Sequence, residues 1–227
     1  MIPALALEGS APSLPGALQR DLTHGRGAGS LAFVNAITAR NQRLSVEEFL
    51  AAEPRYTEKH EYLGGAVHAM AGASTAHNVV AMNLYGILHS GLRGHRCQAF
   101  GSDMKVRLSL AEDTYFYYPD AMVICGETGL GTSWCERPSV LFEILSPGAR
   151  SIHDREKRMA YRTIPSLDAY VVIESEQTEV VAEYRDSEGW RREVYTGKDA
   201  VFRLPSVEIE VPLAELYERL DFTVSNG

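Results

Sequence analysis

The most informative segment for the architecture is VLFEILSPGARSIHDREKRMAYRTIPSLDAYVVIE, residues 140–174. It opens with a short, nearly all-apolar run over 140–145, passes through a loop into a polar helix over 154–162, and closes with an apolar run over 169–173. Such runs are typical of strands buried on both faces. Strand, helix and strand in this order indicate a crossover unit and an α/β (α+β) fold class.

Two helices and a hairpin are predicted upstream of this unit. Ser45 and Glu48 form a capping-box pattern that predicts a helix over 45–52. Gly64-Gly65 between two short apolar runs predicts a β-hairpin. The apolar residues of 74–92 recur at helical spacing, which predicts an amphipathic helix.

The remaining segments favour strands. Alternating apolar and polar residues predict one strand over 100–110. The segment 115–125 is apolar enough for a strand, but Pro119 predicts a bulge or a break before Asp120. Further elements are expected near the C-terminus: a hairpin over 179–184 and 190–195, a strand over 207–211 and a helix over 213–220.

Composition points to one globular domain with an appendage. The chain has 227 residues, 45% of them hydrophobic and 23% charged. We expect a flexible extension over 1–43 with a short helix around 31–39, an ordered domain over 44–222 and a tail over 223–227. The apolar runs are shorter than the roughly 20 residues of a membrane span, and the first residues are a poor signal peptide. We therefore expect a cytoplasmic protein without membrane contact.

Charge and cysteine usage exclude further classes. With 22 basic against 30 acidic residues the net charge is −8, so the chain has no general attraction to a polyanion. A local basic cleft or a divalent cation could still recruit a phosphate. The cysteines, at positions 97, 125 and 135, are odd in number and lack CxxC spacing. They argue against a disulfide framework or a zinc knuckle, and suit a reducing compartment.

Two isolated carboxylates suggest a metal site. Glu143 lies within VLFEIL and Asp120 within YYPDAMVI. Burial of an unpaired charge is costly, so a Glu at this position either faces solvent, pairs with an arginine or binds a metal ion. For Asp120 the alternative is a turn residue after Pro119. If the two carboxylates converge from adjacent strands, a hard cation such as Mg²⁺ could lie between them.

Three further residues are candidates with strong structural alternatives. Lys157 lies on a polar helix and is functional only if that helix points it towards the strand ends, on the face it shares with Asp154 and Tyr161. Glu61, before the predicted hairpin, carries little information alone. His77 lies on the apolar face of the helix over 74–92 and by itself is more simply a core histidine.

Several enzyme classes are excluded by motif. The chain has no GxSxG nucleophile elbow, P-loop, GxGxxG after a strand or HExxH. Basic residues interleaved with aromatic ones, which bind single strands, do not cluster either.

The ordered part of the chain resembles the Uma2 (DUF820) family of the PD-(D/E)XK nuclease superfamily. The matching stretches are LSVEEFLAAEP, HEYLGGAVHAMAGASTAH, GSDMKVRL, YYPDAMVI, the segment 140–174 and the closing hairpin, in the family's order from Leu44 to about Phe222. The resemblance implies a restriction-endonuclease-like core, in which helices flank a central mixed β-sheet. It also implies Mg²⁺-dependent cleavage of DNA, with Mn²⁺ as a possible substitute.

The resemblance also assigns roles to single residues. It makes Asp120, after Pro119, the aspartate of the "PD" element, and Glu143 the acidic residue of the (D/E)XK element. Glu61, His77 and Lys157 match the acidic residue of the hairpin stretch, the histidine after "SP" and the lysine of the "D…EK…Y" stretch.

This chain departs from the superfamily pattern at two positions. The superfamily's lysine should lie two residues after Glu143, where this chain has Leu145, so Lys157 would act from the helix instead. Gly64 replaces the aspartate usual before the hairpin glycine, which we interpret as a change of turn only.

Two hypotheses of different class follow. In the first, the carboxylates of Asp120 and Glu143 and the carbonyl of Ile144 hold the ion, and the chain is an endonuclease acting on DNA. In the second, the fold is kept by a catalytically weak or inactive protein that binds DNA or another protein; the acidic charge and Leu145 support it. A metal-assisted hydrolase of another phosphoester is a third, weaker option. A homodimer is possible, and no organic cofactor is expected.

Overall fold

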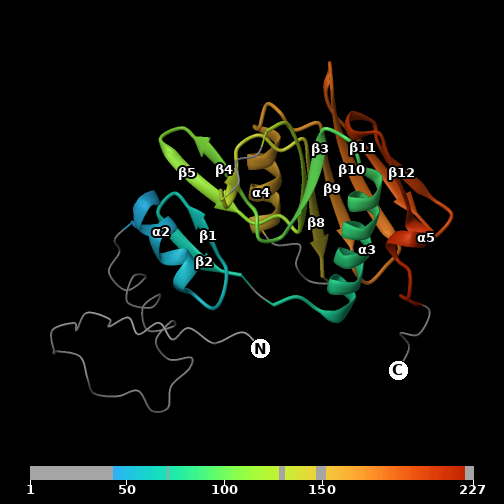
Figure 1. The fold of residues 1–227 in the computed structure, drawn as a ribbon, viewed down its shortest axis with the longest axis horizontal. Coiled ribbons are helices and arrows are strands. Elements are labelled where there is room, and N and C mark those ends of the chain that lie inside the picture. The colour runs from blue at the N-terminus through green and yellow to red at the C-terminus, as the bar shows by residue number, and fades with distance from the viewer. Residues whose placement is uncertain (1–42, 71, 128–130, 147–151, 223–227) are drawn as a thin grey trace, which may run out of the picture.

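The structure, a computed structural model, describes residues 43–70, 72–127, 131–146 and 152–222. The expected short helix around 31–39, nearly all of the expected N-terminal extension and the tail over 223–227 lie outside these ranges. The described residues contain two main sheets, a small two-stranded sheet and the helices that cover them (Figure 1).

A six-stranded mixed sheet forms the centre of the molecule. Its strand order is β11-β10-β9-β8-β6-β3. The strands are β3 (Cys97–Gly101), β6 (Ala121–Cys125), β8 (Val140–Leu145), β9 (Ala169–Glu174), β10 (Glu179–Asp186) and β11 (Gly189–Thr196). The strands β8 and β9 are parallel and are connected through α4 (Ile152–Arg162), whereas the other neighbours are antiparallel. This confirms the predicted crossover unit, mixed sheet and C-terminal hairpin.

One helix covers each face of this sheet. Alternate residues of β8 point to opposite faces, so Phe142 packs in one cluster with Leu84 of α3 (Thr75–Gly91), and Leu141 packs in another with Tyr161 of α4. All four of these side chains are fully buried. A fully buried side chain of this size contributes roughly 1.5–3 kcal/mol, so both helices are held firmly against the sheet.

The N-terminal elements build a second, five-stranded sheet. Its order is β2-β1-β5-β4-β7, and its strands are β1 (His60–Leu63), β2 (Ala66–Ala69), β4 (Lys105–Leu110), β5 (Asp113–Tyr117) and β7 (Trp134–Cys135). Gly64 and Gly65 join β1 to β2 with φ of 55° and 99°, which fits the predicted glycine hairpin. The helix α2 (Val46–Ala52) begins with the predicted capping box and continues into a 3₁₀ turn, η1 (Glu53–Arg55).

Two of the connections between the two sheets, from β3 to β4 and from β5 to β6, lie close to the same place. The predicted strand over 100–110 is wrong as one element, because β3 ends at Gly101 in the central sheet and β4 begins at Lys105 in the other. Continuous hydrophobic alternation hid this turn. The break predicted at Pro119 is confirmed: β5 belongs to the smaller sheet and β6 to the central sheet. These crossings bring the turn at Ser102 close to Asp120, since Tyr85 Oη bonds to both backbones.

The C-terminal elements differ in detail from the expectation. The predicted strand over 207–211 is β13 (Ile209–Pro212), which pairs with the unpredicted β12 (Val201–Leu204) across the 3₁₀ turn η2 (Pro205–Val207). The final helix, α5 (Leu213–Leu216), is shorter than expected. Within the described ranges, none of the helices has the length and apolar content that crossing a membrane requires.

A disulfide joins Cys97 and Cys125, which the cysteine count did not anticipate. The residues are 28 apart in sequence and become direct neighbours only through the β3–β6 register. A crosslink over a loop of this length restricts the unfolded chain, and loop entropy gives about 3–4 kcal/mol.

We expect urea unfolding to show that the free energy of unfolding falls by up to this amount on reduction of the disulfide or in the Cys97→Ala/Cys125→Ala variant. Cys135→Ala, at the free cysteine, is the control; equal stability with and without reductant would contradict the bond.

Candidate active site

The register of the central sheet brings the two predicted carboxylates together. Asp120 immediately precedes β6, and its N–H donates to the carbonyl of Phe142 in β8 at 3.0 Å. Its Oδ2 accepts the N–H of Ile144 at 2.6 Å. Asp120 therefore lies beside the C-terminal half of β8, where Glu143 is 8% exposed. The predicted convergence of the carboxylates across adjacent strands is what the structure shows.

His77 is held against Asp120 by the start of α3. The Ser74 side chain caps this helix by accepting the N–H of His77 at 3.1 Å. His77 Nε2 then lies 3.1 Å from Asp120 Oδ1. The hydrogen bond to Asp120 raises the pKa of His77, with a smaller contribution from the backbone of Ile144, while partial burial opposes the rise. His77 is thus a partner of Asp120 and lines the pocket.

Lys157 reaches the carboxylates from α4. Its Nζ lies 3.0 Å from Glu143 Oε1 and 2.9 Å from Glu61 Oε1, and donates to the Tyr118 carbonyl at 3.5 Å. One turn along the helix, Tyr161 donates to Glu143 Oε1 at 3.1 Å. The functional alternative for Lys157, an orientation towards the strand ends, is therefore the observed one. The side chain of Asp154, expected on the same face, lies outside the described residues.

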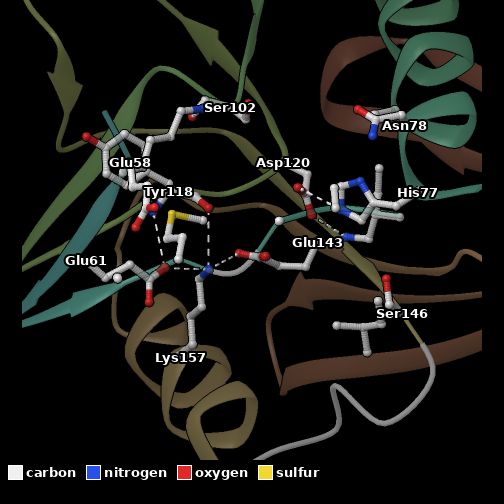
Figure 2. A pocket seen from close by; sticks show the side chains of 18 of the residues that line it. Glu58, Glu61, His77, Asn78, Ser102, Tyr118, Asp120, Glu143, Ser146 and Lys157 are labelled. Carbon is white, nitrogen blue, oxygen red and sulfur yellow. Dashed lines mark hydrogen bonds and ion pairs between the residues drawn. The ribbon is translucent and has the colours of Figure 1, made fainter. Parts of the chain in front are cut away.

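Glu61 joins the site from the second sheet. Its Oε1 accepts from Lys157 and, at 3.4 Å, from the N–H of Tyr118. Glu61 lies on β1, so the strand pairing of the smaller sheet decides its position. All five predicted site residues, namely Glu61, His77, Asp120, Glu143 and Lys157, line one cavity of about 1060 Å³, and Figure 2 shows them pointing towards its centre.

The buried charges shift one another's protonation. Burial raises the pKa of Glu143, Lys157 opposes this, and the carboxylates of Asp120 and Glu61 add to it, giving a value of about 8. Burial alone would lower the pKa of Lys157, but Glu143 and Glu61 raise it well above its usual range. The ammonium group is thus held charged between the carboxyl groups of Glu61 and Glu143. Burial, with Glu143 as the next cause, also raises the pKa of Tyr161.

The donor set fits a hard cation that keeps most of its water. In the described ranges no group of three or more His, Cys, Asp or Glu residues could hold a metal ion. Asp120 and Glu143 nevertheless supply two carboxylates so close that the charge of one raises the pKa of the other, a repulsion that a cation relieves. Mg²⁺ typically takes one or two carboxylates plus waters. Ile144 lines the same cavity.

Tyr118 is a site residue that sequence reasoning missed. Its backbone binds Glu61 and Lys157, as described, while its hydroxyl donates to the buried carboxylate of Glu53 at 2.9 Å. Glu53 Oε1 also accepts the N–H of His60 at 2.8 Å. The only signal was the position of Tyr118 before Pro119-Asp120, because its partners come from distant parts of the chain.

A lysine two residues after Glu143 is absent, and the structure shows what stands in its place. Leu145 occupies that position, and the ammonium group beside Glu143 is that of Lys157, from the following helix. The site therefore contains Asp120, Glu143 and Lys157 on the wall of one pocket. Lys157 is in ion-pair contact with Glu143, and Asp120 accepts the backbone N–H of the next residue, Ile144.

The chain matches one family model and two curated relatives. Residues 46–214 match the family model Uma2, described as "Putative restriction endonuclease". Uncharacterized protein sll1609 of Synechocystis sp. is 36% identical over 61% of this chain and 78% of its own length. Uncharacterized protein slr1290 of the same organism is 29% identical over 79% and 94%.

A solved structure shows the same fold. It is described as a "putative nuclease belonging to DUF820" from Anabaena variabilis, and it aligns with a TM-score of 0.59 at 19% identity. The alignment covers 76% of this chain and 97% of that one. The predicted mixed α+β architecture is therefore shared with a solved protein.

Proposed function

The chain belongs to the Uma2 family, and from that premise and the geometry of the pocket we propose that it is a Mg²⁺-dependent endonuclease that hydrolyses DNA phosphodiester bonds. The observation that carries the proposal is the contact of Lys157 Nζ with Glu143 Oε1 at 3.0 Å, beside Asp120. The sequence motif has a lysine two residues after the acidic residue, where this chain has Leu145. Lys157 places an ammonium group beside Glu143 from the helix α4 instead.

The proposed division of labour follows from the contacts. Asp120, Glu143 and the carbonyl of Ile144 would hold Mg²⁺ or Mn²⁺. The ion, when bound, supplies an activated water and a positive charge for the phosphate. Lys157 orients that water or stabilises negative charge developing on the phosphate, and its own charge is secured by Glu61. His77 holds Asp120 in position through Nε2, and it would either contact the phosphate or only support the site.

Cleavage of supercoiled plasmid tests this proposal. Incubation with Mg²⁺ or Mn²⁺ should produce nicked and then linear DNA, and EDTA should prevent it. Titration calorimetry should show ion binding that weakens in the Asp120→Ala and Glu143→Ala variants. Failure to cleave plasmid, linear duplex and single-stranded DNA in both ions, together with ion binding that ignores both substitutions, would refute it.

A further inference from the structure

Three of the four lysines of this acidic chain lie around Tyr118, at the wall of the pocket. The sequence has lysine at positions 59, 105, 157 and 198 only, and its net charge is −8. Lys157 donates to the carbonyl of Tyr118, while the ammonium groups of Lys59 and Lys105 lie 5.6 and 5.1 Å from the centre of the Tyr118 ring. Three ammonium groups thus surround Tyr118. The Lys157–Glu143 contact accounts for one of them and leaves the positions of Lys59 and Lys105 unexplained.

Of these three, Lys59 is the one that a ligand can reach. Lys157 is enclosed between Glu61 and Glu143, and Lys105 is 5% exposed and does not line the cavity. Lys59 lines the cavity, and its side chain is 37% exposed. Its ammonium group is positioned by Ser102, donating to the carbonyl oxygen at 2.9 Å and to Oγ at 3.0 Å.

The carboxylate partner of Lys59 can be replaced. Lys59 Nζ lies 2.7 Å from Oδ1 of Asp103, whose side chain is 94% exposed. Exposed ion pairs contribute little to stability, so an incoming phosphate can exchange with Asp103 at small cost. The Ser102 hydroxyl already accepts from Lys59 and also bonds to the hydroxyl of Tyr85, and an incoming phosphate oxygen can compete with Tyr85 for its proton. Ser102 and Lys157 enter the view from opposite sides of the pocket (Figure 2).

We infer that Lys59 and Ser102 form a subsite for a non-scissile phosphate of the nucleic-acid strand. The inference rests on the proposed function and specifies its substrate class. A polynucleotide carries phosphates on both sides of the one being hydrolysed, whereas a small phosphoester has none to offer. A second cation on the wall of the catalytic pocket therefore selects a strand over a small phosphoester.

The salt dependence of DNA binding tests the subsite. Fluorescence anisotropy with a labelled oligonucleotide, single-stranded and duplex, is measured in EDTA over a series of salt concentrations. Each neutralised phosphate contributes about 0.7 to the slope of log K against log salt for a single strand and about 0.9 for a duplex. Lys59→Gln should reduce the slope by that amount, and Lys59→Arg should preserve it. Lys198→Gln is the matched control and should behave as wild type, since Lys198 donates to the Leu220 carbonyl outside the pocket.

The outcomes separate this inference from the proposed function. A reduced slope in Lys59→Gln supports the subsite even if plasmid is not cleaved. Wild-type slope and affinity in Lys59→Gln overturn the subsite while leaving cleavage untouched. An equal reduction in Lys198→Gln overturns it too, because the effect is then one of net charge. Absence of DNA binding by the wild type overturns it together with the substrate class. Thermal melting of each variant confirms that it is folded.

Discussion

Replacing Asp120 with asparagine is expected to reduce metal-dependent DNA cleavage at least about 100-fold, because loss of even an outer-shell partner of a metal costs about 10–100-fold and Asp120 would be a direct ligand. The side-chain oxygen of asparagine can still accept the N–H of Ile144, so the turn before β6 should survive. The substitution removes the negative charge of Asp120. That charge faces His77 and, in the proposed function, also faces the cation. Plasmid cleavage at saturating Mg²⁺ measures the effect, and calorimetry measures ion affinity.

Asp113→Asn is the matched control for this substitution. Asp113 is also an aspartate paired with a cation, Arg43 at 3.1 Å, but it is 40% exposed and does not line the pocket. It should cleave as wild type does. Equal cleavage by Asp120→Asn and wild type would show that the carboxylate does no chemistry. DNA binding that persists unchanged in Asp120→Asn, with no cleavage by the wild type, would favour the binding-module hypothesis instead.

Replacing Lys157 with methionine is expected to destabilise the fold by about 3–5 kcal/mol, the usual cost of breaking a buried ion pair from one side. The substitution leaves Glu61 and Glu143, whose side chains are 18% and 11% exposed, without their common cation. Urea unfolding measures the loss at neutral pH. Cleavage should fall on the order of 100-fold or more, because no other described ammonium group lies within ion-pair distance of Glu143.

The pH dependence of this variant has a defined sign. Lys157 lowers the pKa of Glu143, so its removal raises that pKa further above the ordinary value of 4.5. A carboxyl group with a raised folded-state pKa is protonated in both states at low pH and therefore adds no penalty there. As pH rises above about 4.5, the unfolded state ionises first and stability is lost. The wild type shares this loss up to its own Glu143 pKa of about 8, because Glu143 stays protonated in both folded proteins below that pH. The deficit of Lys157→Met should thus be level up to about pH 8 and grow above it, where only the wild type can ionise Glu143 beside a cation.

Two further variants keep this prediction falsifiable. Lys105→Met removes a buried lysine of the same cluster that, among the described residues, has no carboxylate within ion-pair distance, and it should cost much less. Adding Glu61→Gln and Glu143→Gln to Lys157→Met should recover part of the loss, since no buried charge then lacks a partner. A deficit in Lys157→Met that is equal at every pH, or equal to that of Lys105→Met, would contradict the assigned contacts.

Local patterns were sufficient for the elements that carry the site. The all-apolar run over 140–145 identified a buried strand, and the isolated Glu143 within it identified the residue to examine. Pro119 marked the break that places Asp120 immediately before β6, and the Gly64-Gly65 pair marked the hairpin beside Glu61. Each of these signals acts over a few residues, because backbone geometry and alternation are local properties. Their catalytic roles remain predictions.

Long-range pairing was beyond the reach of those patterns. The continuous alternation over 100–110 concealed the turn at Ser102, since alternation does not say which sheet a residue joins. The Cys97–Cys125 bond follows from the β3–β6 register rather than from cysteine spacing. The role of Tyr118, whose partners Glu53, Glu61 and Lys157 lie up to 65 residues away, left no local trace.

Local sequence patterns were enough to predict the fold class, the crossover unit and the candidate residues, because hydrophobic period, caps and turn glycines depend on a few neighbouring residues. The three-dimensional structure was needed to show that Lys157, rather than a residue beside Glu143, supplies the ammonium group. That outcome depends on how α4 packs against the sheet through Tyr161 and on how β1 aligns Glu61, both products of contacts between distant segments. Burial then couples the protonation of Glu143 and Lys157, since charges excluded from water shift one another's pKa far more than exposed ones do.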